Sequence, residues 1–446
     1  MKLAFDVHEK PKFGQLIVFA IQQLLAIMAA TLVVPVIVGN GMSSAAALFG
    51  AGVGTVVYVL FTKKKSPVFL GSSFAFINSM FAAFAGGVSM ALGYLGLIIG
   101  AIFAGLVYVV IATIVKFAGV NWINKLMPAV VIGPTVAIIG LSLAGNAVGD
   151  LQSGTATANP LICVLCGLVA LFVTILCSTY GKKMVKLIPF IIGILSGYAV
   201  SLVFTLIGNA LELDALKVLS FDAFKALTAD GVGISTFFAV PEFTFVKAFK
   251  GCVELSPAYV GAVAVAYIPV AFVVFAEHIA DHKNVSSIIE RDLLEDPGLS
   301  RTLLGDGVGS IFGALFGGCP NTTYGESVAC VAITRNASVA TIIAAAIGAM
   351  LISFLSPFIA FVNSIPKCVM GGICMALYGF IAVSGLKMIK NIDLEENKNL
   401  FVVSIILISG IGNLSLGFGK VTLTPVAVAL ILGIITNIML SKKKAQ

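Results

Sequence analysis

Charged residues are scarce in this chain of 446 residues, since Asp, Glu, Lys and Arg together make up 11% of it. A typical soluble domain holds about 25% charged residues. Hydrophobic residues reach 59%, above the roughly 45–50% usual in soluble proteins. This balance excludes an ordinary soluble globular protein and predicts an all-α polytopic membrane protein.

Side chains that serve catalysis or bind metals are also few. The chain has three His and eight Cys. Cys163 and Cys166 have the spacing of a C-x-x-C motif, but they lie in the apolar run "LICVLCGLVALFVTIL" without a second pair or an adjacent His. We interpret them as small packing residues, with a metal or redox site as the minor alternative. We therefore expect no cofactor, no metal and no enzymatic activity.

The apolar runs predict the number of membrane spans, because a spanning helix needs about 20 predominantly apolar residues. Long runs lie at residues 15–38, 43–62, 91–116, 128–146, 160–179, 187–208, 258–281, 338–362, 368–388, 399–412 and 422–440. Shorter or interrupted runs lie at 68–86, 302–317 and 319–334. Together they predict about fourteen spans.

The basic residues orient these spans. With the N-terminus inside, most of the 27 Lys and Arg residues fall on the inside, including the clusters "TKKKSP", "YGKKMVK" and "SKKKAQ". The exceptions are Lys217, Lys225, Lys247, Lys250, Lys367 and Lys420, and most of these lie in one long loop, 209–257. This is the positive-inside pattern. It predicts that both termini are cytoplasmic, and it explains the formal charge of +7 without a nucleic-acid partner.

Two interrupted segments resemble each other: "PVFLGSSFAFINSM" at 67–80 and "GGCPNTTYGESVAC" at 317–330. Each combines Gly, consecutive hydroxyl residues and an aromatic residue in a shortened apolar run. They fall at the third and tenth of fourteen spans, which is the same place in two seven-span halves. An odd number of spans makes the halves inverted repeats, and paired broken spans in such repeats indicate the binding site of a transporter.

Four acidic residues fall within predicted spans: Glu277, Asp281, Asp306 and Glu326. An ionisable group inside a span is costly and is by default a candidate functional residue. Glu277 and Asp281 are four residues apart and share one helix face. In the alternative reading, Asp281 and His282 are solvated at the helix mouth, and Asp306 is interfacial. His278 points away from Glu277 and suits packing or hydrogen bonding.

Glu326 follows a segment in which Pro320 and neighbouring Gly and Thr residues disfavour a continuous helix. Extended backbone survives at membrane depth only inside protein or along a cavity. Residues 72–76 can supply its partners as a short strand, and each broken span then leads into a half-helix with free N–H groups. Carboxylate acceptors beside N–H donors suit a flat ligand with alternating N–H and C=O groups, such as uracil.

At these residues the chain resembles the nucleobase–cation symporter-2 (nucleobase–ascorbate transporter) family, most of all its bacterial uracil permeases. The resemblance covers nearly the whole chain. It is carried by "ATLVVPV", "FLGSSFAFI", "FAEHIADH", "DLLEDPGLSRTLLGDG", "CPNTTYGESVACVAITR" and "IPKCVMGG".

The resemblance implies a core domain of residues 1–120 and 258–365 and a gate domain of residues 121–208 and 366–446, with an extracellular loop at 209–257. Spans 3 and 10 would each hold a short strand and a half-helix. Relatives dimerise through the gate domain, so a homodimer is possible.

The resemblance also implies roles for single residues. Glu277 and Glu326 match substrate-binding acids, while Phe74 and Gly325 match positions whose backbone N–H groups meet the base. Ser73 and Tyr324 would line the pocket. Glu277, Asp281 and His278 are candidates for proton coupling.

The chain departs from the family pattern at three positions. Ser327 and Ala329 stand where the wider signature has Asn and Gly. Asp281 stands where uracil permeases have His, with His282 following it. Glu at position 326 resembles the pyrimidine branch, since purine carriers usually have Gln there.

We therefore expect a uracil:proton symporter in the cytoplasmic membrane of a bacterium. Sodium coupling stays open, as does transport of xanthine, urate or another nucleobase. An anion carrier of the related fold is a further alternative, although carboxylates would repel its substrate.

Overall fold

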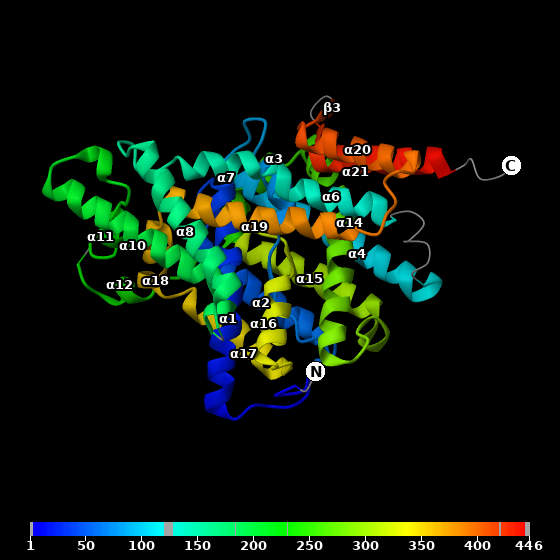
Figure 1. The fold of residues 1–446 in the computed structure, drawn as a ribbon, viewed down its shortest axis with the longest axis horizontal. Coiled ribbons are helices and arrows are strands. Elements are labelled where there is room, and N and C mark those ends of the chain that lie inside the picture. The colour runs from blue at the N-terminus through cyan, green and yellow to red at the C-terminus, as the bar shows by residue number, and fades with distance from the viewer. Residues whose placement is uncertain (1–2, 120–127, 183, 230, 419–420, 442–446) are drawn as a thin grey trace.

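The structure is a computed structural model that describes residues 3–119, 128–182, 184–229, 231–418 and 421–441. Figure 1 shows its helices along the chain. The elements of the first half are α1 (Phe13–Val38), α2 (Ser44–Phe61), β1 (Leu70–Ser72), η1 (Phe74–Phe76), α3 (Ile77–Ala83), α4 (Met90–Ala118), α6 (Ala129–Ser142), α7 (Ala144–Leu151), α8 (Pro160–Tyr180), α9 (Met184–Leu187) and α10 (Pro189–Ala210).

Short helical elements occupy the connection to the second half: η2 (Asp214–Leu216), α11 (Asp222–Ala226), α12 (Ile234–Phe237), α13 (Thr244–Ala248) and η3 (Phe249–Glu254). The second half contains α14 (Pro257–Ile289), η4 (Leu294–Gly298), α15 (Leu299–Gly317), β2 (Asn321–Thr323), α16 (Gly325–Thr334), α17 (Val339–Ile352), α18 (Ser356–Ser364), α19 (Lys367–Met388), α20 (Asn397–Ile411), β3 (Leu416–Phe418), β4 (Val421–Leu423) and α21 (Pro425–Ser441).

The predicted fold class is confirmed. Among the described residues, 8 helices are long and apolar enough to cross a membrane, and shorter apolar helices complete about fourteen segments in two seven-span repeats. Short strands lie in the third and tenth segments, as expected, but the first strand is Leu70–Ser72 rather than 72–76, because Phe74–Phe76 already forms a helical turn. Lys183, Lys420 and Lys442–Lys444, which contribute to the charge pattern, lie outside the described residues.

Three predicted boundaries are wrong. The span expected at 338–362 is two helices, because Pro357 lacks the N–H that a continuous helix would need there, and Leu355, just before α18, is extended. The span expected at 128–146 divides into α6 and α7 and continues to Leu151. The span expected at 258–281 is the 33-residue helix α14, which continues two turns past Asp281 to Ile289.

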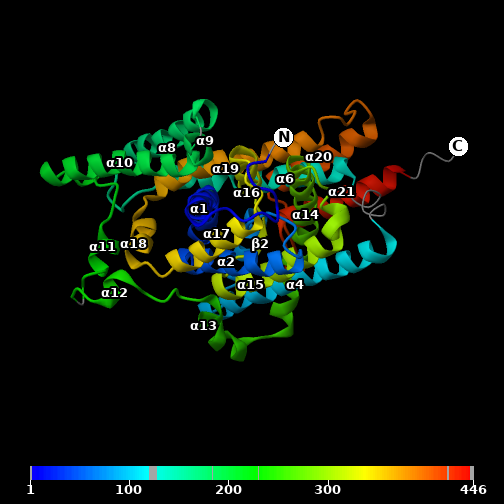
Figure 2. The same ribbon diagram turned by 90° about the horizontal axis from the view of Figure 1, so that it is seen from below.

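The helices form two bundles. In the first bundle, α2 packs on α15 and α17, while α4 packs on α14 and α15. In the second, α19 packs on α6, α7 and α8, and α20 packs on α6 and α21. Figures 1 and 2 agree that α8, α10, α19 and α20 lie on one side of the molecule and α2, α15 and α17 on the other. The group with α2, α15 and α17 is called the first bundle, and the group with α8, α10, α19 and α20 is called the second bundle.

The two broken spans meet at the centre of the first bundle, where β1 and β2 pair antiparallel. In the register, Leu70 pairs with Thr323, Gly71 with Thr322 and Ser72 with Asn321. Two backbone bonds extend the ladder, from the Ser73 N–H to the Pro320 carbonyl at 2.9 Å and from the Tyr324 N–H to the Phe69 carbonyl at 3.2 Å. The ladder satisfies backbone groups that would otherwise cost several kcal/mol each in a bilayer.

Glycines let the surrounding helices approach this ladder. A Cβ atom at Gly54 would lie 2.7 Å from the carbonyl oxygen of Gly309 and would overlap the Asn321 amide. A Cβ atom at Gly317 would lie 2.6 Å from the Cα atom of Ala47. These glycines set the distance between α2 and α15, and small residues at such contacts are typical of packed membrane helices.

The N-terminal segment, residues 4–9, binds the turn that follows α16. The Ala4 N–H donates to the Arg335 carbonyl at 2.7 Å, and the Val339 N–H donates to the Val7 carbonyl at 3.0 Å. Asp6 forms an ion pair with Arg291, just beyond the end of α14. The segment therefore connects the ends of the two helices that carry Glu277 and Glu326.

The glycine contacts predict a stability difference. Gly54→Ala and Gly317→Ala should each destabilise the protein by about 1–3 kcal/mol, because the added methyl group overlaps fixed backbone. Gly261→Ala in α14 is the matched control, since no atom lies within 4 Å of its Cβ position. Thermal unfolding in detergent tests this. Equal melting temperatures for all three variants would contradict the packing argument.

Candidate substrate-binding site

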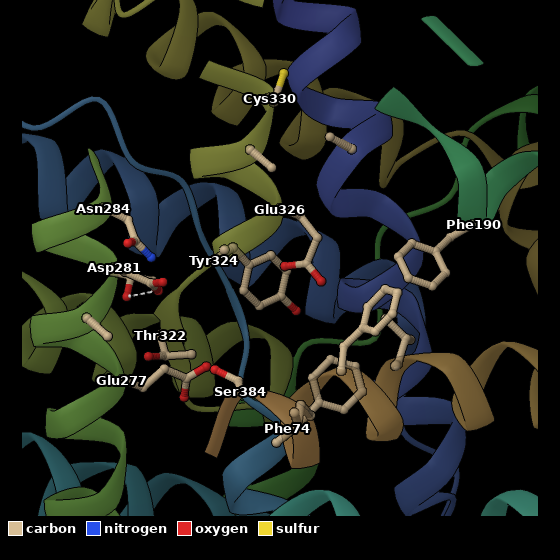
Figure 3. Close-up of a pocket in the computed structure, with 18 of the residues that line it drawn as sticks. Phe74, Phe190, Glu277, Asp281, Asn284, Thr322, Tyr324, Glu326, Cys330 and Ser384 are labelled. Carbon is tan, nitrogen blue, oxygen red and sulfur yellow. Dashed lines mark hydrogen bonds between the residues drawn. The ribbon is translucent and has the colours of Figure 1, made fainter. Parts of the chain in front are cut away.

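A cavity of about 460 Å³ lies between the two bundles. The first bundle contributes residues from α1, η1, α14, β2 and α16, and the second contributes residues from α6, α8, α9, α10 and α19. Three carboxylates line it, those of Glu277, Asp281 and Glu326. Lys186 is the one basic side chain among the described residues of its wall. Figure 3 shows the three carboxylates around the same space.

Two of these carboxylates come from α14. The helix begins after Ser256, whose side chain accepts a hydrogen bond from the Tyr259 N–H, and Pro257 suits its first turn. Glu277 and Asp281 are one turn apart and both face the cavity. The Thr323 hydroxyl donates to Asp281 Oδ2 at 2.8 Å, the bond drawn as a dashed line in Figure 3. Strand β2 therefore fixes the direction of Asp281.

The third carboxylate lies at the start of the half-helix α16. Gly325 and Glu326 are its first residues, and both line the cavity. The first N–H groups of a helix lack partners within the helix, and its N-terminus carries partial positive charge. Phe74, at the start of η1, also lines the cavity. The wall thus places backbone donors beside carboxylate acceptors.

Aromatic rings flank these groups. The Tyr324 hydroxyl donates to the Ser72 carbonyl at 2.7 Å, which fixes its ring over Gly71. A side chain at position 71 would collide with that ring, so glycine is required there. The Phe74 ring lies 6.2 Å from the Tyr378 ring in an edge arrangement at 78°. Phe74 and Tyr324 both line the cavity, so a flat ligand can contact both of these aromatic residues.

The cavity wall therefore brings together five of the predicted binding residues: Glu277, Glu326, Phe74, Gly325 and Tyr324. Ser73 is fully buried and is not among the residues of the wall. Of the two departures from the signature, Ala329 lines the cavity. Ser327 does not, because its hydroxyl accepts from the Phe69 N–H at 2.9 Å and from Gln23.

Sequence reasoning missed several residues of the wall. Thr322 and Thr323 stand in the broken segment, where only their backbone was considered. Asn284, Phe190 and Ser384 also line the cavity. A single Ser or Phe in an apolar helix of the second bundle gives no sequence signal of its own.

His278 points away from the cavity into the first bundle. Its Nδ1 lies 2.7 Å from Asp306 Oδ2, and its Nε2 lies 3.0 Å from the Thr302 hydroxyl. The Thr302 hydroxyl donates to the Leu299 carbonyl at 3.1 Å, so it accepts a hydrogen bond from His278 Nε2–H. One further proton is then shared between Nδ1 and Asp306, and the pair is neutral overall in either arrangement.

His282 is fixed in a similar way. Its Nδ1 lies 2.7 Å from the His278 carbonyl, which can only accept, so Nδ1 carries the hydrogen. Its Nε2 lies 2.6 Å from the Tyr58 hydroxyl, which in turn lies 2.7 Å from the Ser66 hydroxyl. His282 and Asp306 are fully buried and Asp281 is 8% exposed. The alternative with solvated or interfacial positions is therefore wrong, because α14 continues past Asp281 and His282, and α15, which carries Asp306, packs on α2 and α4.

The fold matches that of solved membrane transporters. The transmembrane domain of the cyanobacterium bicarbonate transporter BicA superposes with a TM-score of 0.58 at 14% identity, covering 97% of this chain and 100% of that chain. Murine Solute Carrier 26 family member A9, an anion transporter in the inward-facing state, gives 0.65 at 10% identity over 98% of this chain and 70% of that chain. This likeness shows that the chain shares the fold of these two structures.

The family follows from sequence comparison. A profile of the Permease family matches residues 14–417. The uracil permease of Bacillus subtilis (strain 168) is 37% identical over 100% of this chain and 97% of its own length. The uracil permease of Bacillus caldolyticus is 38% identical over 98% of this chain and 95% of its own length. The uracil permease of Escherichia coli (strain K12) is 33% identical over 97% of this chain and 92% of its own length. The chain belongs to this permease family, which confirms the resemblance to nucleobase–cation symporters.

The buried pair predicts a non-additive effect on stability. Asp306→Ala or His278→Ala should each cost about 3–5 kcal/mol, because the remaining partner is buried without its counterpart. The double variant should lose clearly less than the sum of the two losses. Thermal unfolding of the three variants in detergent measures this. Additive losses would show that the two side chains act independently.

Proposed function

We propose that this permease takes up uracil, or a closely related nucleobase, across the cytoplasmic membrane together with protons. Three full-length relatives bear the name uracil permease. The proposal depends most on one observation: Glu277 and Glu326, from two different elements, line one cavity beside the start of α16. Two hydrogen-bond acceptors thereby stand next to backbone donors.

The chemistry of uracil fits this arrangement. Its ring edge alternates N–H donors with carbonyl acceptors, so the carboxylates accept from the ring N–H groups while backbone N–H groups near Phe74 and Gly325 donate to a carbonyl. Hydrogen bonds to charged groups contribute about 1.5–3 kcal/mol each. The rings of Phe74 and Tyr324 add contacts to a flat ligand. An anionic substrate suits the site poorly, because three carboxylates face a single Lys186.

Coupling to a cation is required for accumulation, since uracil is neutral near pH 7 and the membrane potential does not act on it. Burial disfavours the charged form of a carboxylate, which makes such a group a suitable proton carrier. We propose that Glu277 takes a proton from outside with the substrate and that Asp281, one turn away, shares it. His278 contributes through its bond to Asp306.

Alternating access then moves the first bundle against the second. In this proposal residues 1–120 and 258–365 form a core domain that carries the substrate, and residues 121–208 and 366–446 form a gate domain. Residues 209–257 form an extracellular loop, and both termini are cytoplasmic. Rigid-body rocking of two such units around a fixed site is the usual mechanism in folds of inverted repeats.

Uptake of labelled uracil into proteoliposomes tests the site. Glu277→Gln and Glu326→Gln should each weaken uptake at low substrate concentration by about tenfold or more, because each loses a hydrogen bond to a charged group. Glu395→Gln is the matched control, since Glu395 is exposed and is not among the residues of the cavity wall. Unimpaired uptake by both site variants would refute the assignment. Displacement of uracil by unlabelled xanthine or urate would widen the substrate class.

The coupling ion is tested with imposed gradients. An acidic exterior should drive accumulation of uracil in the absence of sodium, and collapse of the pH gradient should abolish it. An inward sodium gradient at equal pH should drive none. Accumulation that follows sodium and ignores pH would replace proton coupling by sodium coupling.

A further inference from the structure

The hydroxyl group of Thr322 has no hydrogen-bond partner among the described residues, although the side chain is 98% buried from solvent, with 2% exposed. Its neighbours in β2 do have partners. Asn321 donates through its amide to the Gly50 carbonyl at 3.2 Å, and Thr323 donates to Asp281. A buried polar group left unpaired costs about 1–3 kcal/mol. Such groups are rare in native proteins and require an explanation.

The register of the ladder places the Thr322 side chain on the face toward the cavity. Thr322 pairs with Gly71, and side chains two residues apart in a strand share a face, so Thr322 lies on the same face as Tyr324. Both residues line the cavity. Because β2 is held by the ladder, the backbone and Cβ atom of Thr322 are at a fixed position, and rotation about the Cα–Cβ bond turns the hydroxyl toward a ligand. Figure 3 shows Thr322 between Asp281 and Glu277 on one wall.

The surroundings decide which role the hydroxyl has. Glu277, beside it, is an acceptor for an N–H group of a ligand, whereas a Thr hydroxyl can donate to a carbonyl oxygen. Placed side by side, the two groups recognise an N–H and an adjacent C=O on one ring edge. That edge is the lactam unit of an oxo-pyrimidine or oxo-purine.

Resting on the function proposed above, we propose that Thr322 is a substrate-binding residue whose hydroxyl donates a hydrogen bond to a carbonyl oxygen of the transported base. Together with Glu277 it recognises the N–H and the adjacent C=O of the lactam edge of the ligand. An analogue that carries sulfur in place of that oxygen offers the hydroxyl a weaker acceptor.

Binding of labelled uracil to the purified full-length protein tests this. Thr322→Val keeps the shape of the side chain and removes the hydroxyl, and it should weaken binding about three- to tenfold, as expected for loss of one neutral hydrogen bond. Thr322→Ser keeps the hydroxyl and should bind within about twofold of the natural protein. Thr113→Val is the matched control, since Thr113 lies in α4 outside the cavity wall.

Thio-analogues identify the ligand atom. Sulfur is a weak acceptor, so 2-thiouracil or 4-thiouracil should bind more weakly than uracil to the natural protein, according to which carbonyl meets Thr322. That difference should disappear in Thr322→Val for the same analogue. The loss of discrimination is a readout that a purely structural threonine would not change.

The outcomes separate this proposal from the proposed function. If the natural protein binds no nucleobase, the proposed function fails. If it binds uracil and Thr322→Val binds it equally well, only the role of Thr322 is overturned. Equal weakening by Val and Ser, with the thio-discrimination intact, would assign Thr322 to packing. If binding of uracil depended on sodium and Thr322→Val alone lost this dependence, the hydroxyl would be a ligand of a cation and the proposed contact with the base would be wrong. Matching melting temperatures establish that the variants fold.

Discussion

The antiparallel pairing of β1 with β2 is the interaction on which the site depends. A helix broken at membrane depth exposes backbone N–H and C=O groups, each of which costs several kcal/mol if unpaired. Here the two broken spans satisfy one another, with Leu70 opposite Thr323 and Ser72 opposite Asn321. Because both η1 and α16 begin where the strands end, one short ladder places two sets of backbone donors at the same cavity.

This pairing in turn constrains the residues packed around it. Gly54 leaves room for the Asn321 amide, which bonds to the Gly50 carbonyl, and Gly71 leaves room for the Tyr324 ring. Ser327 bonds to the Phe69 N–H and so attaches the first turn of α16 to the chain before β1. Ser327 stands where the family signature has Asn. Because its side chain is not part of the cavity wall, this difference affects the attachment of the half-helix α16.

The sequence predicts the spans and the two breaks well because length, apolarity and the cost of charge in a bilayer are local properties. Glu277 and Glu326 were found for that reason. The end of α14 was missed because the polar residues after Asp281 resemble a loop. The segment "NTTYGE" contains two adjacent threonines with different roles. The Thr323 hydroxyl donates to Asp281, whereas the Thr322 hydroxyl has no partner among the described residues. Only the register distinguishes them.

Helix α14 separates two kinds of ionisable residue by its periodicity. Glu277 and Asp281 share the face toward the cavity, while His278 and His282 share the face toward the bundle, with their rings stacked 4.0 Å apart. Asp306 and Tyr58 bind the two imidazoles from α15 and α2. A rotation of α14 about its axis would break both bonds and bury carboxylates among apolar side chains, at a cost of several kcal/mol. The imidazole face thus fixes the orientation in which the carboxylates face the cavity.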